Sequence, residues 1–170
     1  NIASYLQLKE NFKIKSNIYS TLKNSFIQIL EFFKKKNNLK YYNIYLYDVF
    51  GHGDKRDKIF NAIVNCYKKN KVLEIQNPKN LIAPVFIKDV CDVINGYISN
   101  EKRAKEIHIN SGKTMSLQRL GNIAKSVLRG LKIKKLKNEN KDYLKIYKLK
   151  KYKINKDLES TLKDFFKKYV

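Results

Sequence analysis

The chain is poor in cysteine, in arginine and in long apolar runs, and the shortages of cysteine and of apolar runs each exclude a class of protein. Its two cysteines, Cys66 and Cys91, are too few for a disulfide framework or a zinc site. Both lie in apolar helical patterns, so we predict buried free thiols and a reducing, cytoplasmic setting. The apolar runs FIQIL and LIAPVFI are far shorter than the ~18 residues that a membrane span needs. The sequence therefore predicts neither a disulfide scaffold, nor a metal site, nor a membrane span.

Basic residues are abundant, but their kind and distribution argue against a nucleic-acid reader. The formal net charge is +22, from 37 Lys and Arg against 15 Asp and Glu. Only four of the 37 are arginine, the better base reader, and the lysines spread along the whole chain. A solvated basic surface explains this charge better than a binding patch does. We predict no specific nucleic-acid partner.

Helical and extended patterns alternate along the chain. Its 170 residues, 43% of them apolar, are enough for one ordinary domain with a core. Apolar residues at helical spacing predict a helix over 19–36, and the aromatic run YYNIYLY predicts a strand at 41–47. DVFGHGDKR, at 48–56, is predicted as a loop, and a second amphipathic helix follows at 57–70.

The remaining patterns complete an α/β chain. Strands are expected at 72–76, at 81–87 with a break at Pro84, and at 106–110; helices are expected at 89–98, 116–128 and 157–169. Ser116 is placed to cap the helix that it begins. Because strands and helices alternate throughout, the predicted fold class is α/β.

Tyr19 and Lys23 lie one turn apart at the front of the first predicted helix. Residues four apart share a helix face, and a lysine ammonium stabilises a neighbouring phenolate, so such a tyrosine can take or give a proton. The spacing alone proves nothing, because the chain has five such pairs: Tyr5–Lys9, Tyr19–Lys23, Tyr67–Lys71, Tyr147–Lys151 and Tyr152–Lys156. Only Tyr19 has a small hydroxyl residue upstream, Ser4, with a long amphipathic helix and then a strand and a glycine-containing loop downstream.

The order of these segments resembles a known family. Ser4, YSTLK, YLYDVFGHGDKR, LIAPVFIKDV, INSGKTMSLQRLGNIA and LKKYKINKDLESTLKDFF follow one another as in the second half of the extended short-chain dehydrogenases that act on nucleotide sugars. This is the NAD-dependent epimerase/dehydratase family, and the CDP-abequose and CDP-paratose synthase-like reductases are the most similar group. The resemblance runs over nearly all 170 residues, and the order is more specific than any one segment.

The resemblance implies an incomplete Rossmann-type, doubly wound fold that lacks its N-terminal half. Residues 1–50 would be the second half of the dinucleotide-binding domain, and residues 51–170 would mix a substrate-binding region with closing Rossmann elements. The missing early strands would pair with the strand around 41–47, whose edge would lose its cover here.

The resemblance also implies roles for five residues, and two more are expected to bind the substrate. Tyr19 would be the acid/base, and Lys23 would hold the cofactor ribose and favour the tyrosinate. Ser4 would hydrogen-bond the sugar oxygen. Tyr47 would lie beside the nicotinamide and Asp48 beside the substrate. The arginine that some relatives use near Ile82 to hold the sugar diphosphate is absent, so we expect Arg56 and Lys58 to bind this anion instead; a plain solvated loop is the alternative.

One sequence motif of the family is not found in the chain. The family's members bind NAD or NADP through a Gly-x-x-Gly-x-x-Gly turn, and GHGDKR at 51–56 has Arg56 where the third glycine would be. The sequence leaves open the sugar nucleotide, NAD against NADP, homodimer formation, and the choice among epimerase, dehydratase and reductase. The alternative is a non-catalytic remnant or a basic, polyanion-binding interaction module of the same fold.

Overall fold

The computed structural model describes residues 1–8, 18–99, 106–136, 154 and 157–170. In chain order its elements are β1 (Ile2–Ser4), the 3-10 helix η1 (Tyr5–Gln7), α1 (Ile18–Asn37), β2 (Asn43–Leu46), β3 (Asp48–Phe50), α2 (Ile59–Lys68), β4 (Val72–Ile75), β5 (Leu81–Ile82), β6 (Pro84–Phe86), α3 (Ile87–Ser99), β7 (Glu106–Ile109), β8 (Met115–Ser116), α4 (Leu117–Val127), β9 (Lys132–Lys135) and α5 (Leu158–Lys167). The α/β prediction is confirmed, and every predicted helix is present. The basic tail before α5 lies largely outside the described residues.

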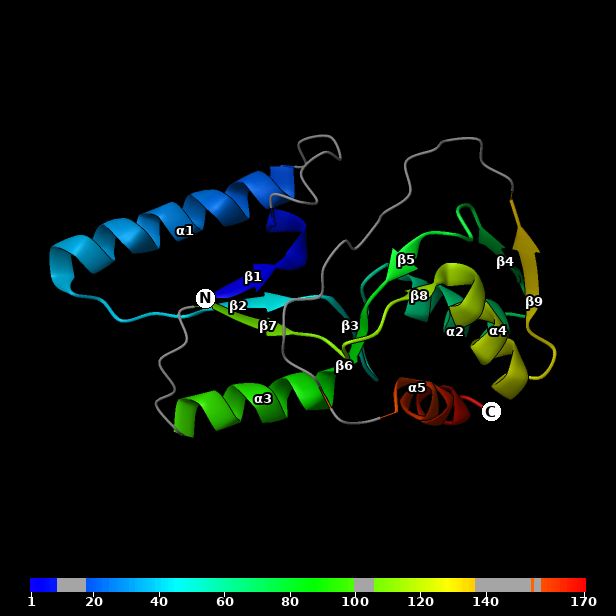
Figure 1. Ribbon diagram of the computed structural model, residues 1–170. Helices are drawn as coiled ribbons and strands as arrows, with labels where there is room; N and C mark the ends of the chain where they lie inside the picture. The colour runs from blue at the N-terminus through cyan, green and yellow to red at the C-terminus, as the bar shows by residue number, and fades with distance from the viewer. Residues whose placement is uncertain (9–17, 100–105, 137–153, 155–156) are drawn as a thin grey trace.

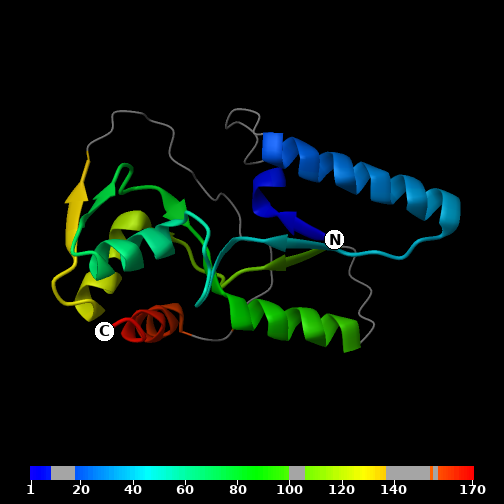
Figure 2. The ribbon, with the colours of Figure 1, turned by 180° about the vertical axis from the view of Figure 1, so that it is seen from behind.

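A three-stranded parallel sheet, in the order β1-β2-β7, lies between α1 and α3 (Figures 1 and 2). Within the described chain β2 has neighbours on both sides, so the prediction that further strands would pair with residues 41–47 is wrong. The apolar start Ile2–Ser4 is itself a strand and takes that position beside β2. In the described part of the chain the two edge strands of this sheet are therefore β1 and β7.

The predicted loop at 48–56 begins later than expected. Asp48–Phe50 forms β3, which pairs in parallel with Pro84–Phe86, and both Val49 and Phe50 are buried. Two buried apolar residues next to the aromatic run favour an extended strand over a loop. The prediction was wrong for these three residues, and the loop starts at Gly51.

The expected strand at 81–87 is two strands with different partners. β5 pairs antiparallel with β8, whereas β6 pairs in parallel with β3. The predicted break is present but falls at Ala83, one residue before the expected position, because Pro84 is the first residue of β6. Ala83 donates its N–H to the Asp48 carboxylate (2.8 Å), so the break supplies one contact of the candidate site.

The main hydrophobic core lies in the lobe that holds α2, α4 and α5. Phe50 stacks on Phe60 with ring centroids 4.6 Å apart, and Phe165 meets Phe50 edge-on at 5.3 Å. The predicted cap is confirmed, because the Ser116 hydroxyl accepts the N–H of Arg119 at 3.2 Å. A second, smaller core forms where α3 packs on the sheet.

The two cysteines are less buried than predicted. Cys66 in α2 is half-buried and Cys91 in α3 is exposed. Val90 faces the core, and the next residue along a helix points about 100° away, which turns Cys91 toward solvent. The prediction of a buried thiol is wrong for Cys91.

α1 packs much less than the other long helices. Of its 20 residues only Ser20 is buried. Within the described chain, no helix is long and apolar enough to cross a membrane. The division into residues 1–50 and 51–170 stays a prediction; the sheet itself joins strands from both ranges, since β2 pairs with β7.

Candidate functional site

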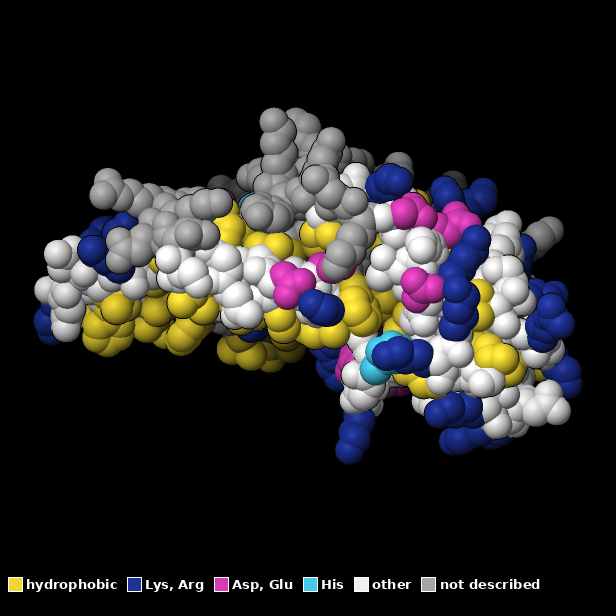
Figure 3. Space-filling view, turned by 90° about the horizontal axis from the view of Figure 1, so that it is seen from below, with side chains coloured by type: hydrophobic (Ala, Val, Ile, Leu, Met, Phe, Trp, Pro, Cys, Tyr) yellow, Lys and Arg dark blue, Asp and Glu magenta, His cyan; other side chains and the backbone are white. Residues whose placement is uncertain are grey.

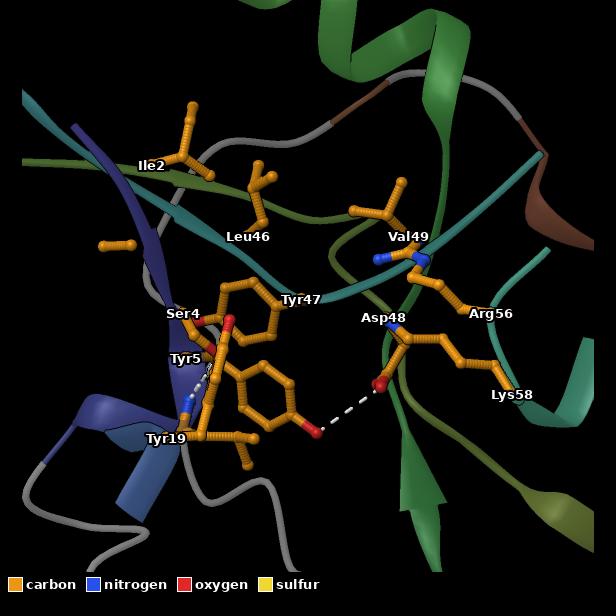
Figure 4. A pocket seen from close by; sticks show the side chains of 12 residues that line it. Ile2, Ser4, Tyr5, Tyr19, Leu46, Tyr47, Asp48, Val49, Arg56 and Lys58 are labelled. Carbon is orange, nitrogen blue, oxygen red and sulfur yellow. Dashed lines mark hydrogen bonds between the residues drawn. The ribbon is translucent and has the colours of Figure 1, made fainter. Parts of the chain in front are cut away.

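A pocket of about 470 Å³ opens where β1 and β2 end. Because both strands run in the same direction and Ser4 is in register with Leu46, the residues that follow each strand meet at one edge of the sheet. Six of the seven candidate residues line this pocket: Ser4, Tyr19, Tyr47, Asp48, Arg56 and Lys58. Figure 4 shows Ser4, Tyr5 and Tyr19 on one side, Arg56 and Lys58 on the other, and Tyr47 between them.

Ser4 is held at the junction of β1 and η1. Its hydroxyl caps the 3-10 helix by accepting the N–H of Leu6 at 3.3 Å, while its own N–H donates to the Gln7 side chain at 2.6 Å. A hydroxyl that accepts one bond still has its O–H to donate. Ser4 is buried and fixed, so it can present that donor to a ligand oxygen in the pocket.

Tyr19 and Lys23 lie together on the pocket side of α1. Tyr19 is 46% exposed and lines the pocket, and the Lys23 amine lies 5.9 Å from the centre of its ring. That amine also donates to the Ile2 carbonyl at 2.8 Å, which ties α1 to β1. Lys23 is therefore beside the pocket but, in the described part of the chain, is not among the residues that line it.

Tyr47 forms a rigid wall with Tyr5. Their rings stack with centroids 5.0 Å apart and planes 7° from parallel, and both side chains are buried. The Tyr47 hydroxyl lies 3.4 Å from Nδ1 of His108, whose ring stacks on Tyr45 at 4.6 Å. Aromatic packing on both sides leaves this wall few rotamers.

Asp48 is the acidic group of the pocket. Its Oδ2 accepts the N–H of Ala83 at 2.8 Å, and its Oδ1 accepts the Tyr5 hydroxyl in a long bond of 3.4 Å. Burial raises the pKa of Asp48, while the Ala83 N–H, the charge of Lys58 and the Tyr5 hydroxyl oppose that rise. Burial and the adjacent Asp48 also raise the pKa of Tyr5, which keeps it a donor.

Arg56 and Lys58 form the cationic end of the pocket. Arg56 forks onto the Asp54 carboxylate at 2.8 and 2.6 Å, and this guanidinium holds the pKa of Asp54 at about 2. Lys58 is the residue before α2, and partial burial, followed by the charge of Arg56, lowers its pKa. Gly53, at φ 78°, gives the loop the left-handed turn that precedes these residues.

The pocket combines apolar side chains with polar ones, but the turn after β1 offers no glycine-rich cradle for a phosphate. Apolar Ile2 and Leu46 lie in the same pocket as the phenol of Tyr19 and the hydroxyl of Ser4. The turn after β1, which is Tyr5–Gln7, contains no glycine, so in this described turn the backbone cannot approach a phosphate as a glycine-rich turn does. The described residues also contain no group of three or more His, Cys, Asp or Glu that could hold a metal ion.

Comparison with known proteins shows the family of the chain. The family model described as "NAD dependent epimerase/dehydratase family" matches residues 7–112, more than half of the chain. The chain belongs to this family. The resemblance found in the sequence is thereby confirmed.

Individual members of the NAD dependent epimerase/dehydratase family are distant relatives of the chain. The CDP-abequose synthase of Yersinia pseudotuberculosis is 27% identical over 103 residues, which are 59% of this chain and 36% of that protein. The UDP-N-acetylglucosamine 4-epimerase of Methanobrevibacter ruminantium M1, solved with UDP-N-acetylmuramic acid, superposes with a TM-score of 0.75 at 17% identity, over 98% of this chain and 60% of that one. The dTDP-glucose 4,6-dehydratase of Bacillus anthracis, solved with NAD, superposes with a TM-score of 0.76 at 14% identity, over 91% of this chain and 52% of that one.

The chain thus spans between 36% and 60% of the length of these three proteins. At the identities of the two solved structures, the likeness shows the fold alone, and it confirms the Rossmann-type prediction.

Two residues of the site were missed in the sequence. Tyr5 was counted only as one of five Tyr-x-x-x-Lys spacings, although its position directly after Ser4 at a strand end was a usable signal. His108 drew no notice, although it stands in a strand otherwise made of apolar residues and one glutamate. Local spacing reveals neither the contact of Tyr5 with Asp48 nor that of His108 with Tyr47, because each joins residues more than 40 positions apart.

Proposed function

We propose that this chain is the catalytic and substrate-binding portion of an NAD(P)-dependent enzyme that exchanges a hydride at a carbon of a nucleotide-diphosphate sugar. The reaction would be that of an epimerase, a dehydratase or a reductase. The observation that carries the proposal is the meeting, in one pocket, of six residues chosen from the sequence alone. NAD or NADP supplies the hydride acceptor or donor when bound.

The proposed proton transfer belongs to Tyr19. Its phenol exchanges the proton of the reacting sugar hydroxyl, and Ser4 donates a hydrogen bond to the sugar oxygen. Lys23, beside the Tyr19 ring, holds the cofactor ribose and favours the phenolate electrostatically. Tyr47 bounds the space for the nicotinamide with its stacked ring.

The proposed substrate lies across the pocket with its diphosphate toward Arg56 and Lys58. Both are cationic, and Lys58 directly precedes α2, where helix N–H groups favour an anion. Asp48, between the cations and Ser4, then faces the sugar. A homodimer formed through the exposed apolar face of α1 and a cytoplasmic location complete the proposal.

Ligand binding tests this function directly. Saturation-transfer NMR with UDP-, CDP-, dTDP- and GDP-glucose should detect binding of at least one nucleotide sugar by the chain. Arg56→Ala and Lys58→Ala should each weaken that binding about tenfold. Lys125→Ala, which removes a lysine of α4 outside the pocket lining, should leave binding unchanged. Absence of binding by every nucleotide sugar would refute the proposal.

Cofactor binding gives a second measurement. Because the turn after β1 lacks glycine, the isolated chain should bind NAD and NADP weakly or not at all by calorimetry. A clear micromolar signal would contradict the proposed division of labour between this chain and a glycine-rich turn elsewhere.

The net charge of +22 favours one rival function, a basic module that binds polyanions. A salt-dependent gel shift with mixed DNA or RNA, combined with no nucleotide-sugar binding, would support that rival. The coding sequence upstream of Asn1 separates enzyme from remnant: a strand followed by Gly-x-x-Gly-x-x-Gly in frame supports the enzyme, and a stop codon in a matching frame supports the remnant.

A further inference from the structure

The proposed function gives the Tyr5–Asp48 pair no role in proton transfer or in cofactor binding. Asp48 presents both carboxylate oxygens in a fixed direction, because Ala83 N–H holds Oδ2 at 2.8 Å and the Tyr5 hydroxyl holds Oδ1 at 3.4 Å. A carboxylate has about four acceptor sites, so each oxygen can still accept a further hydrogen bond. Asp48 is thus an oriented acceptor on the wall of the pocket.

Tyr5 is itself held in place by both its backbone and its ring. It is the first residue of η1, which the Ser4–Gln7 capping box fixes at its N-terminus. Tyr5 is only 7% exposed, and its ring lies flat against that of Tyr47. The direction of the Tyr5 hydroxyl, and with it the orientation of Asp48, is therefore set by packed side chains (Figure 4).

The pocket has a cationic end and an opposite end that carries hydroxyl groups. Arg56 and Lys58 lie at one end and Ser4 and Tyr19 at the other, and Asp48 lies between them, near enough to Lys58 for that charge to stabilise its carboxylate. An anionic diphosphate is attracted to the cationic end and repelled by Asp48, so the sugar is the part of the ligand that meets this carboxylate. A sugar hydroxyl or ammonium can donate to Asp48, whereas a sugar carboxylate meets a like charge.

We propose that Asp48, oriented by Tyr5 and by the Ala83 N–H, selects sugar nucleotides that present a hydroxyl or amino donor and discriminates against sugars that bear a carboxylate. Asp48 is the specificity-determining residue, and Tyr5 is a positioning residue that acts through it. This inference rests on the proposed function, because it assumes that a nucleotide sugar occupies the pocket.

The test compares two ligands that differ at one group, UDP-glucose with a hydroxymethyl and UDP-glucuronic acid with a carboxylate, and uses UDP as reference. Dissociation constants are measured by saturation-transfer NMR on the whole chain. The wild type should bind UDP-glucose about tenfold more tightly than UDP-glucuronic acid. In Asp48→Asn, which keeps the shape and removes the charge, the two constants should come within about twofold of each other.

Variants of two buried tyrosines separate positioning from general packing. Tyr5→Phe keeps the stacked ring and removes the donor, so it should reduce the preference for UDP-glucose. Carbon-13 NMR should then show a higher pKa of Asp48, because the carboxylate has lost a donor. Tyr45→Phe, at a similarly buried tyrosine outside the pocket lining, should change neither value.

The outcomes distinguish the inference from the function on which it rests. Equal binding of both sugars by the wild type, or an unchanged preference in Asp48→Asn, overturns the inference and leaves the proposed function standing. An unchanged pKa of Asp48 in Tyr5→Phe overturns the positioning role of Tyr5. Failure of UDP and of both UDP-sugars to bind, together with failure of the other nucleotide sugars, overturns the proposed function and this inference with it.

Discussion

α1 and α5 have similar sequences and very different surroundings. Both are amphipathic and both carry lysine in the last turn, yet α5 buries Leu158, Leu162, Phe165 and Phe166 among its ten residues, and α1 buries only Ser20 among twenty. Figure 3, seen from below, shows hydrophobic side chains along the half of the molecule that holds α1 and α3, and basic side chains gathered over the half with α2, α4 and α5. Helical spacing of apolar residues therefore predicts a helix without predicting what covers it.

The difference bears on the candidate site because the proposed acid/base is carried by the weakly packed helix. Seven of the large hydrophobic side chains exposed in the described chain lie on α1: Ile18, Tyr19, Leu22, Phe26, Ile29, Phe32 and Phe33. Side-chain contacts that hold α1 include the Lys23 bond to Ile2 and a 3.1 Å bond between Gln7 and Asn24. Elements with few buried contacts open at low free-energy cost, so Tyr19 is expected to be the most mobile member of the site.

The largest effect is expected at the core side of α5. Phe166 is fully buried, and Phe166→Ala should lower the free energy of unfolding by about 3–5 kcal/mol. Phe32→Ala is the matched control on α1, where the side chain is 58% exposed, and should change it by less than about 0.5 kcal/mol. Urea unfolding followed by circular dichroism measures both. Equal costs would mean that α1 is covered as fully as α5 in solution.

A smaller effect is expected at the start of α5. Asp157 caps the helix by accepting the N–H of Ser160 at 2.9 Å, so Asp157→Ala should cost about 1 kcal/mol. Asp157→Asn keeps an acceptor oxygen and should cost less. If alanine and asparagine proved equally stable in the same urea titration, the cap would contribute nothing to holding α5 on the core.

Much of the fold was predictable because it depends on local periodicity. The helix at 19–36, the cap at Ser116 and the break next to Pro84 all follow from residues within a few positions of one another. The three-residue strands β1 and β3 were not predicted, because three residues are too few to show the alternation of apolar and polar residues that marks a strand. Their existence depends on partners distant in the sequence, as when Asp48 pairs with Pro84.

For the candidate site, too, sequence reasoning found the features that depend on local spacing and missed the contacts between distant segments. Tyr19 and Lys23 could be chosen because their spacing is local, and family resemblance supplied Ser4, Tyr47 and the charged residues. The Tyr5–Asp48 bond joins residues 43 apart, and the contact of Asp48 with Ala83 spans 35 residues. Contacts of this kind arise only when strands pair, so one sequence without its fold does not reveal them.

A pH effect of less than about 1 kcal/mol is expected where α5 meets the loop of the site. His52 stacks on Phe165 at 4.8 Å and contacts the Tyr169 hydroxyl at 3.3 Å, and burial and then Lys168 lower its pKa. A lowered folded pKa means that the neutral form is favoured on folding. The contribution is therefore fully present above about pH 6.5, the unfolded pKa, and is lost as the pH falls through the folded pKa.

Urea unfolding at pH 7.5 and at pH 5.5 measures this pH effect. His52→Gln should reduce the difference in stability between the two conditions, and the wild type should lose more stability at the lower pH. An identical pH dependence in His52→Gln and in the wild type would assign the effect to other groups and remove His52 from the contact between α5 and the loop.

Substitutions on the exposed face of α1 are expected to change stability least. They should have their main effect on self-association. Leu22, Phe26 and Ile29 are 64%, 47% and 50% exposed and lie on one side of the helix at spacings of four and three. Replacing all three by glutamine removes no buried contact, so each change should alter the free energy of unfolding by less than about 0.5 kcal/mol. Exposed apolar stripes of this kind drive association, so the wild type should self-associate in sedimentation velocity and the triple variant should sediment as a monomer. A wild type that is monomeric at all concentrations would remove the homodimer from the proposal. A triple variant that unfolds would show that this face of α1 is buried in solution and that α1 and α5 do not differ in their packing.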